Sequence, residues 1–520
     1  MAGPRRSFTV DSLSGAEQPN TGGPMKCNIC LSVFLLASSI VARADVRLPK
    51  IFSDHMVVQR DRAAPIWGWA NPGERIVVRF AGQRVRAVAD LAGNWSVALQ
   101  PLQASAKPRK LIVSGENRIV LHDVLVGDVW LASGQSNMVY AMGGLWGRNP
   151  PPVPQSPGSK PVVWPPPAER MIQDRQSPQC PTVRLNRQMW LQFILPNLPA
   201  PVSPGWQLCS PETLFEFSAV AYYFAKNLQD VLHVPIGVIE SAVGGTRIEA
   251  WTPQSAYAES PAFRNDPDLA KGLIDGEPAG RLYNPWIEPL QPFAIKGVIW
   301  YQGESNVVID DLRYGAKMNL LISSWRNAWH DDDLPFYFVQ LAPFAYSDLK
   351  KSPAASQNLT DETLPEVWQQ QVDVLMDPNT GMALTIDLVE DVHDIHPPDK
   401  WDVGHRLALL ALEKTYRVGN IVSQGPQFKS METLSNQVSI TFENLNGGLL
   451  SLDGKPLTGF SIAGADGRFV PAQAVIQGDK VLVSSSLIEH PAAVRFAWNE
   501  AAKTNLGNQA GLPATPFKTQ

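Results

Sequence analysis

A serine motif and a histidine segment, far apart in the chain, contain the residue types of a nucleophile and its base. Ser136 lies in GQSNM (134–138), and DVHDIHP (391–397) holds two of the eight histidines of the chain. A serine hydroxyl is a weak nucleophile until a base accepts its proton, and the base in turn needs an orienting partner. Ser136, His396 and a nearby aspartate would therefore complete a set for acyl transfer.

The histidine segment also permits a second chemistry, metal binding. Two histidines and two aspartates within residues 391–396 could ligate a cation. Ordinary metal sites draw further ligands from elsewhere in the chain, and no other cluster has ligand spacing. We therefore expect no metal and no other cofactor.

Two further loops carry groups that suit a reacting ester. The segment SAVGGT (241–246) contains Gly244 and Gly245, where a backbone N–H can approach a developing oxyanion closely. The segment WYQGESN (300–306) places two amides and a carboxylate in a short span, those of Gln302, Glu304 and Asn306. Simple turns and loop hydrogen bonds would explain either segment equally well if it stood alone.

The elements around these motifs predict an α/β domain over residues 127–415. Apolar runs alternate with helical stripes, a pattern typical of a doubly wound parallel sheet. The five predicted strands are Asp128 to Ala132, Ile236 to Glu240, Lys296 to Tyr301, Phe336 to Leu341, and Met382 to Leu388. Ligands bind beyond the carboxyl ends of such strands, and four of the five are followed by one of the polar motifs above.

Different patterns flank and interrupt this domain. Residues 45–126 show the period-two alternation of a β-sandwich, and residues 416–520 predict a second β-domain. A proline-rich insertion near 142–216 fits neither pattern. It follows directly on the serine motif, so it is expected to be either a wall or lid of the site or a mobile surface loop.

The N-terminus predicts export. Residues 25–44 have a basic start, an apolar stretch and the cleavage pattern Ala42-Arg43-Ala44, as in a signal peptide, so the mature chain would start near Asp45. Residues 1–24 are expected to be a non-native or disordered extension. The apolar stretch is shorter than a membrane-spanning helix, so we expect a periplasmic or secreted protein without stable membrane insertion.

The cysteines and the net charge bear on disulfide formation and on the class of partner. Cys180 and Cys209 lie outside the predicted signal peptide and can form one disulfide or remain as two buried thiols. The formal net charge of −5 gives no electrostatic reason to expect nucleic acid as a partner.

The motifs taken together resemble the sialate O-acetylesterase family of the SGNH hydrolase superfamily. The resemblance includes GQSNM (134–138), GGTRIEAW (244–251), WYQGESN (300–306) and DIHP (394–397), in that order, and extends over nearly the whole mature chain. It implies an SGNH-type (flavodoxin-like) domain that removes O-acetyl groups from a carbohydrate.

The resemblance also implies residue roles. Ser136 would be the nucleophile and His396 the general base, while the oxyanion hole would consist of the Ser136 N–H, a glycine of Gly244-Gly245, and Gln302. SGNH enzymes place an aspartate three residues before this histidine, whereas position 393 here is a histidine.

The acid partner of His396 is therefore chosen between two neighbours. We favour Asp394 over Asp391, with a backbone carbonyl as the alternative that could orient the imidazole. Asp394→Asn is expected to lower turnover strongly and Asp391→Asn only mildly. Glu304 matches a family motif without a role that the sequence defines.

The sequence leaves the sugar open. Acetylated sialic acid competes with acetylated xylan or xyloglucan, and Arg247 is a candidate contact for a sialate carboxylate. A non-catalytic carbohydrate-binding protein is the alternative from another class, against which the intact Ser136, Asp394 and His396 argue. The oligomeric state is also left open.

Overall fold

The computed structural model describes residues 45–144, 166–189 and 202–519. The predicted extension 1–24 and signal peptide 25–44 lie outside these residues, as do two parts of the proline-rich insertion. Within the described residues, no helix is both long enough and apolar enough to cross a membrane.

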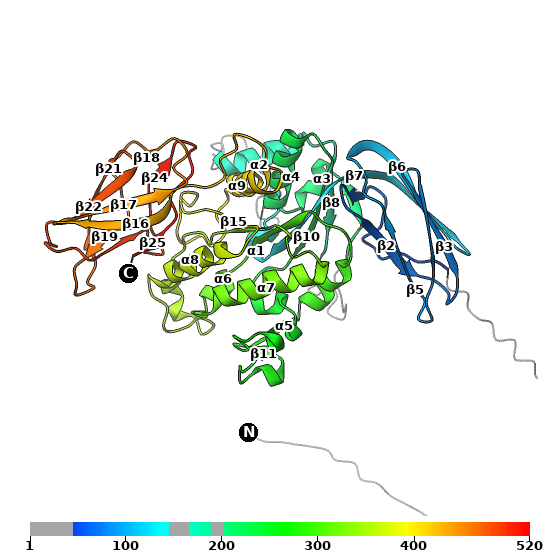
Figure 1. Cartoon of the computed structure of the whole chain (residues 1–520), viewed down its shortest axis with the longest axis horizontal. Coiled ribbons are helices and arrows are strands. Elements are labelled where there is room, and N and C mark those ends of the chain that lie inside the picture. Colours follow the sequence, from blue (N-terminus) through cyan, green and yellow to red (C-terminus); the bar gives the residue numbers. More distant parts are fainter. Residues whose placement is uncertain (1–44, 145–165, 190–201, 520) are drawn as a thin grey trace, which may run out of the picture. The chain divides into compact units, whose positions relative to one another are not determined.

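A mostly parallel sheet forms the centre of the α/β region (Figure 1). Its strand order is β15-β14-β13-β7-β10-β8-β9, and only β9 runs antiparallel to its neighbour. The strands are β7 (Arg118–Gly134), β8 (Val183–Arg187), β9 (Trp206–Leu208), β10 (Ile236–Ala242), β13 (Gly297–Tyr301), β14 (Phe336–Val339) and β15 (Thr380–Ala383).

Helices cover both faces of this sheet. In Figure 1, α4 (Ala219–Leu232) and α9 (Lys400–Leu410) lie on one side of the central strands, and α7 (Tyr314–Trp329) and α8 (Thr363–Asp373) on the other. The shorter α-helices are α1 (Ser136–Val139), α2 (Pro166–Gln176), α3 (Pro211–Phe215), α5 (Gln254–Glu259) and α6 (Glu304–Val307). The Ser218 side chain caps α4 by accepting from the Ala221 N–H, which fixes where that helix begins.

The five predicted central strands are all present, with changed bounds. The fifth begins at Thr380 and ends at Ala383, so most of the predicted range Met382 to Leu388 is loop. The first is part of a longer strand, β7, and the predicted domain boundary at 126–127 falls inside it. Apolar runs predict buried segments well, but they do not show where backbone pairing stops.

Residues 142–216, which fit neither sequence pattern, contain regular structure in their described part. This segment contributes α2, α3 and the strands β8 and β9. β8 lies near the edge of the sheet, between β10 and the short β9. Its sequence, VRLNR, lacks the long apolar run by which the central strands were predicted.

Two groups of antiparallel strands flank the central sheet. Residues before the α/β region form β1 (Val57–Gln59), β2 (Ala64–Trp69), β3 (Arg75–Phe80), β4 (Gln83–Val88), β5 (Asn94–Leu99) and β6 (Ser105–Ser114). The first half of β7 pairs with β6 and β1, and its second half pairs with β10 and β13. One strand thus belongs to both sheets.

The C-terminal strands form two four-stranded sheets, β16-β17-β22-β21 and β20-β19-β23-β25, and the pair β18-β24. They are β16 (Gln427–Leu434), β17 (Gln437–Glu443), β18 (Leu449–Ser451), β19 (Phe460–Ala463), β20 (Val470–Pro471), β21 (Gln473–Gln477), β22 (Lys480–Ser484), β23 (Ala493–Phe496), β24 (Leu506–Asn508) and β25 (Phe517–Lys518). The molecule is therefore mixed α/β with additional β-structure on both sides in the sequence.

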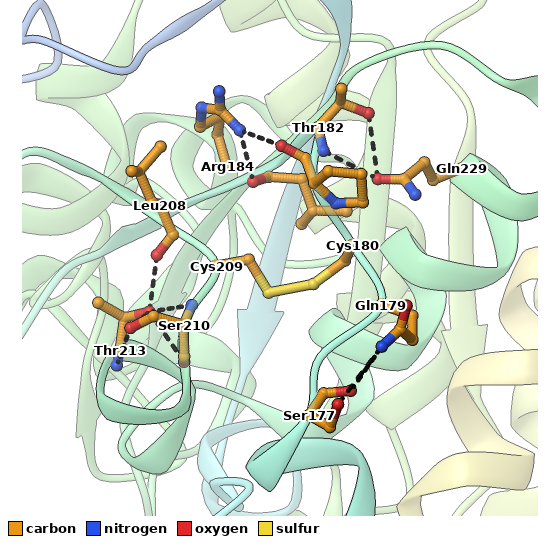
Figure 2. Close-up of a disulfide and its surroundings, with 12 residues drawn as sticks. Ser177, Gln179, Cys180, Thr182, Arg184, Leu208, Cys209, Ser210, Thr213 and Gln229 are labelled. Carbon is orange, nitrogen blue, oxygen red and sulfur yellow. Dashed lines mark hydrogen bonds between the residues drawn. A yellow bond between two sulfur atoms is a disulfide. The ribbon is translucent and has the colours of Figure 1, made fainter.

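Cys180 and Cys209 form a disulfide (Figure 2). Cys180 precedes β8 and Cys209 follows β9, so the bond closes the hairpin-like segment at the edge of the sheet. Nearby, Thr182 donates to Gln229 on α4 from both its backbone N–H and its hydroxyl (Figure 2). These links hold the described part of the insertion against the core.

Candidate active site

Ser136 and His396 lie within hydrogen-bonding distance at the carboxyl end of the sheet. Ser136 follows β7 directly as the first residue of α1, and His396 lies in the loop between β15 and α9. The Ser136 Oγ is 2.8 Å from the His396 Nε2. The two residues are 260 positions apart in the chain, so only the strand order brings them together. This is the geometry of a serine and the base that accepts its proton.

The loop before α9 sets the orientation of His396 through its backbone. Asp394 Oδ1 accepts a hydrogen bond of 2.8 Å from the His396 backbone N–H. Within the described residues the Asp394 carboxylate contacts His396 through this bond and not through the ring nitrogen. Burial, followed by the positive charge of Lys400, lowers the pKa of His396, and the Asp394 charge opposes that shift. The imidazole is thereby held in its neutral form.

Asp391 faces away from this pair. Its carboxylate is exposed and accepts from the backbone N–H of His393 at 2.9 Å and lies 3.2 Å from the His393 Nδ1. Of the two aspartates weighed from the sequence, Asp394 is the one next to His396.

The glycine pair after β10 lies against the serine. A Cβ added to Gly244 would come 3.4 Å from the Ser136 Cβ, so the backbone approaches Ser136 closely at this point. Gly245 has a φ of +70°, which favours glycine, and turns the chain away. Gly244 and Ser136 both line the cavity described below.

Gln302 lies behind the cavity wall. Its side chain is fully buried, and its Nε2 donates to Asn306 Oδ1 at 2.8 Å and to the Thr246 carbonyl at 3.0 Å. Because its amide protons already have acceptors and the residue does not line the cavity, the geometry does not support the predicted oxyanion role. Gln302 instead fixes the loop that carries the two glycines.

Arg247 and Asn306 belong to an ionic cluster that is buried except at Asp275, which is exposed, and at the partly buried Arg247. We call it the Lys317 cluster: Lys317, Glu249, Asp275, Asp311, Arg247 and Asn306. The Lys317 Nζ lies 2.8 Å from Glu249 and 2.6 Å from Asp311. Arg247 binds Glu249, so it does not face the cavity as a sialate contact would.

The same cluster contains the described acidic groups that could converge on a metal ion. The carboxylates of Glu249, Asp275 and Asp311 lie within 4.8 Å of one another. The Lys317 ammonium binds all three, so it supplies the positive charge that an ion would bring.

A second buried set, the Lys400 chain, consists of Lys400, Asn137 and Glu304. Lys400 Nζ donates to Asn137 Oδ1 at 2.6 Å. The Asn137 Nδ2 donates to Glu304 Oε1 and, at 2.9 Å, to the Ile395 carbonyl. Burial raises the pKa of Glu304, while its bond from Asn137 acts in the opposite direction. Glu304 thus contacts the residue that follows Ser136.

A cavity of about 460 Å³ opens at Ser136 and His396. This volume falls within the usual range for small-molecule sites and exceeds what an acetyl group needs. Arg187, Gln188 and Met189 form part of its wall, so the insertion contributes to the site. Arg187 Nη1 lies 2.8 Å from Glu216 Oε2, and its Nε lies 3.8 Å from Glu240. Burial raises the pKa of Glu240 to about 7, against the effect of Arg187.

The sequence analysis missed Lys400, Asn137 and Arg187. One signal for Lys400 was available: it begins the stripe that continues with Val403 and Leu407, so it lies on the buried face of α9. Arg187 had no comparable signal, because it lies in the segment that the proline-rich composition concealed.

Known proteins resemble this chain in sequence and in structure. A family model described as carbohydrate esterase, sialic acid-specific acetylesterase, matches residues 126–412. The chain belongs to this family. The human sialate O-acetylesterase is 29% identical over 423 residues, with 75% of each chain covered. The mouse sialate O-acetylesterase is 28% identical over 477 residues, covering 79% of this chain and 82% of the relative.

A solved structure agrees with the sequence comparisons. A carbohydrate acetylesterase from Xanthomonas citri superposes with a TM-score of 0.76 and 34% identity, over 91% of this chain and 99% of the other. Residues 126–412, which the family model matches, include Ser136, Gly244, Glu304 and His396. The esterase is accordingly a carboxylic ester hydrolase that acts on O-acetyl groups of a carbohydrate.

Proposed function

We propose that Ser136 is the nucleophile and His396 the general base of this esterase, in an α/β domain of SGNH type. The observation that carries the proposal is the 2.8 Å contact between the Ser136 Oγ and the His396 Nε2, at the wall of the 460 Å³ cavity. The positions of both residues, beyond the carboxyl ends of parallel strands, support it.

The reaction proceeds in two halves. The Ser136 Oγ attacks the acetyl carbonyl carbon while its proton moves to the His396 Nε2, and the backbone N–H groups of Ser136 and Gly244 stabilise the oxyanion. The tetrahedral intermediate collapses with cleavage of the bond to the sugar oxygen, which takes the proton from His396. Water then attacks the carbonyl carbon of acetyl-Ser136 while its proton moves to His396. The bond from that carbon to the Ser136 Oγ breaks, the Oγ takes the proton back from His396, and acetate leaves.

The positions of the other predicted residues assign them supporting tasks in this proposal. Asp394 positions the histidine loop through the His396 backbone N–H and adds a negative charge near the imidazole. Gln302 holds the glycine loop through the Thr246 carbonyl. Arg247 and Asn306 stabilise the fold through the Lys317 cluster.

O-acetylated sialic acid is the proposed substrate, because the curated relatives carry that activity in their names. Acetylated xylan or xyloglucan is the second candidate. Arg187 is the charged residue of the cavity wall that favours an acidic sugar, since a guanidinium binds a carboxylate with two hydrogen bonds. Of its two carboxylate partners, Glu216 is exposed, and such surface ion pairs exchange at little cost, whereas Glu240 is buried 3.8 Å from the Arg187 Nε.

A location outside the cytoplasm is part of the proposal, with residues 25–44 as signal peptide. The Cys180–Cys209 disulfide supports it, because such bonds persist in oxidising compartments.

Acetate release from three substrates tests the function. O-acetylated sialic acid, acetylxylan and acetylated xyloglucan are incubated with the esterase and with Ser136→Ala as control. We expect release by the wild type and a loss of at least about 10³-fold in the variant. Ser136→Ala with full activity would overturn the assignment of the nucleophile, and no release by either protein would support a binding protein.

A further inference from the structure

The Lys400 chain joins the three loops that form the active site. Asn137, which Lys400 binds, is the residue that follows Ser136. Asn137 in turn donates to the carbonyl of Ile395, the residue that precedes His396. Its third member, Glu304, begins α6 after β13. No role in bond making is assigned to Lys400 or Asn137 above, yet both lie within one or a few residues of the reacting pair.

We infer that Lys400 is a positioning residue of the esterase: it holds the Ser136 turn against the His396 loop through Asn137, and it buries a positive charge beside these two segments. This inference rests on the proposed roles of Ser136 and His396.

The burial of Lys400 is the first argument. Its side chain is fully buried, and lysine is rarely found so unless a carboxylate pairs with it. Within the described residues its hydrogen bond goes to a neutral amide, that of Asn137, at 2.6 Å. The rings of Tyr140 and Tyr301 lie 4.9 and 5.5 Å from its Nζ and offer weaker cation–π stabilisation. A lysine with only a structural role would be expected to bind carboxylates, as Lys317 does.

The charges around Lys400 and His396 are the second argument. Burial lowers the pKa of Lys400 to about 7, against the negative charges of Glu304, Asp394 and Asp399. Burial and Lys400 lower the pKa of His396 below its ordinary value of about 6.5, against Asp394. A positive charge on Lys400 therefore disfavours the imidazolium form of His396.

Two variants separate the charge from the hydrogen bond. Lys400→Gln removes the charge and keeps a donor for Asn137, whereas Lys400→Met removes both. We expect the acid limb of the pH profile of kcat/KM to move up by about one pH unit in both variants. We expect kcat on the alkaline plateau to stay within a few-fold of the wild type in Lys400→Gln and to fall by about tenfold in Lys400→Met. Circular dichroism and thermal melting confirm that each variant is folded.

A direct titration of His396 separates this inference from the proposed function. NMR follows the imidazole in Ser136→Ala with and without Lys400→Gln, and His396→Asn identifies its signal. A pKa of His396 that rises with Lys400→Gln supports the inference, and an unchanged pKa overturns it. Activity that does not depend on Ser136 would instead overturn the proposed function, whatever the titration shows.

Discussion

Two fully buried lysines of this esterase have opposite surroundings. Lys317 binds three carboxylates, and although its burial alone would lower its pKa, Glu249, Asp311 and Asp275 raise it. Lys400 binds a neutral amide, and its pKa falls to about 7. A charge-matched lysine stabilises the fold, whereas an unmatched one beside a histidine changes how that histidine holds its proton.

Removal of the matched lysine is the largest expected effect. Lys317→Met leaves the carboxylates of Glu249, Asp275 and Asp311 without their shared cation, so we expect the free energy of unfolding to fall by about 3–5 kcal/mol. Equilibrium unfolding in urea measures it. Lys400→Met is the matched control, and its cost should be clearly smaller because Lys400 donates to the neutral Asn137 amide, so no carboxylate of the described residues loses a hydrogen-bonded cation. Equal losses in the two variants would contradict the comparison.

Asp394 and Lys400 have opposite effects on the pKa of His396, so the loss of the Asp394 charge tests the same comparison. The Asp394 charge raises the pKa of His396, so Asp394→Asn should move the acid limb of kcat/KM to lower pH, where Lys400→Gln moves it higher. Turnover should fall by roughly 10- to 100-fold, less than for an aspartate that binds the ring directly. Asp391→Asn is the control and should remain within about two-fold, since its carboxylate faces solvent. A larger loss of turnover in Asp391→Asn than in Asp394→Asn would exclude Asp394 as the residue that positions His396.

Glu249 and Glu304, one from each lysine's surroundings, separate stability from activity. Glu249→Gln removes a partner of both Lys317 and Arg247, so we expect a loss of about 2 kcal/mol in stability with near-normal turnover of the folded enzyme. Glu304→Gln keeps an acceptor for Asn137 and removes a charge beside Lys400. For it we expect kcat to fall by about tenfold with little change in melting temperature. Steady-state kinetics and thermal melting of both variants check this. A loss of kcat in Glu249→Gln together with a loss of stability in Glu304→Gln would contradict the assignment.

Acid sensitivity is the smallest expected difference. Although burial opposes it, the charges of Lys317 and Arg247 lower the pKa of Glu249 below its ordinary value. Its contribution to stability is therefore complete above the ordinary pKa and is lost as the pH falls through the folded value. Between pH 5 and 3.5 the wild type should lose about 1 kcal/mol more than Glu249→Gln. Parallel curves of unfolding free energy against pH would indicate that Glu249 is not held ionised by the cluster.

The proximity of two site residues could be predicted from the sequence where each residue follows a recognisable strand of the parallel sheet. Ser136 and His396 each follow an apolar run that becomes a parallel strand, and parallel strands end at a common edge, so their proximity could be predicted from the order of elements. The predicted helical stripe of Phe217, Val220, Phe224, Leu228 and Val231 is likewise buried at its first four positions, whereas Val231 near the end of α4 is 43% exposed. Such features depend on residues close together in the chain.

Contacts between distant segments could not be predicted in the same way. Arg247 and Asn306 look like ligands for a substrate because they are polar and follow strands. Their true partners, Glu249 and Asp311, became evident only once α7 placed Lys317 among them. Gln302 has the amide of an oxyanion donor, but the positions of the Thr246 carbonyl and Asn306 decide where that amide points.

The long strand β7 has a consequence for how this protein can be divided. Its first half completes the N-terminal sheet and its second half runs directly to Ser136, with no linker between the two. A cut after residue 126 would separate Gly127, which pairs with Gln59 of β1, from the backbone that β1 and β6 pair with, and would leave Ser136 on a shortened strand. The N-terminal strands are therefore not an accessory that recombination or truncation can remove cleanly, and any minimal active fragment must retain the full length of β7.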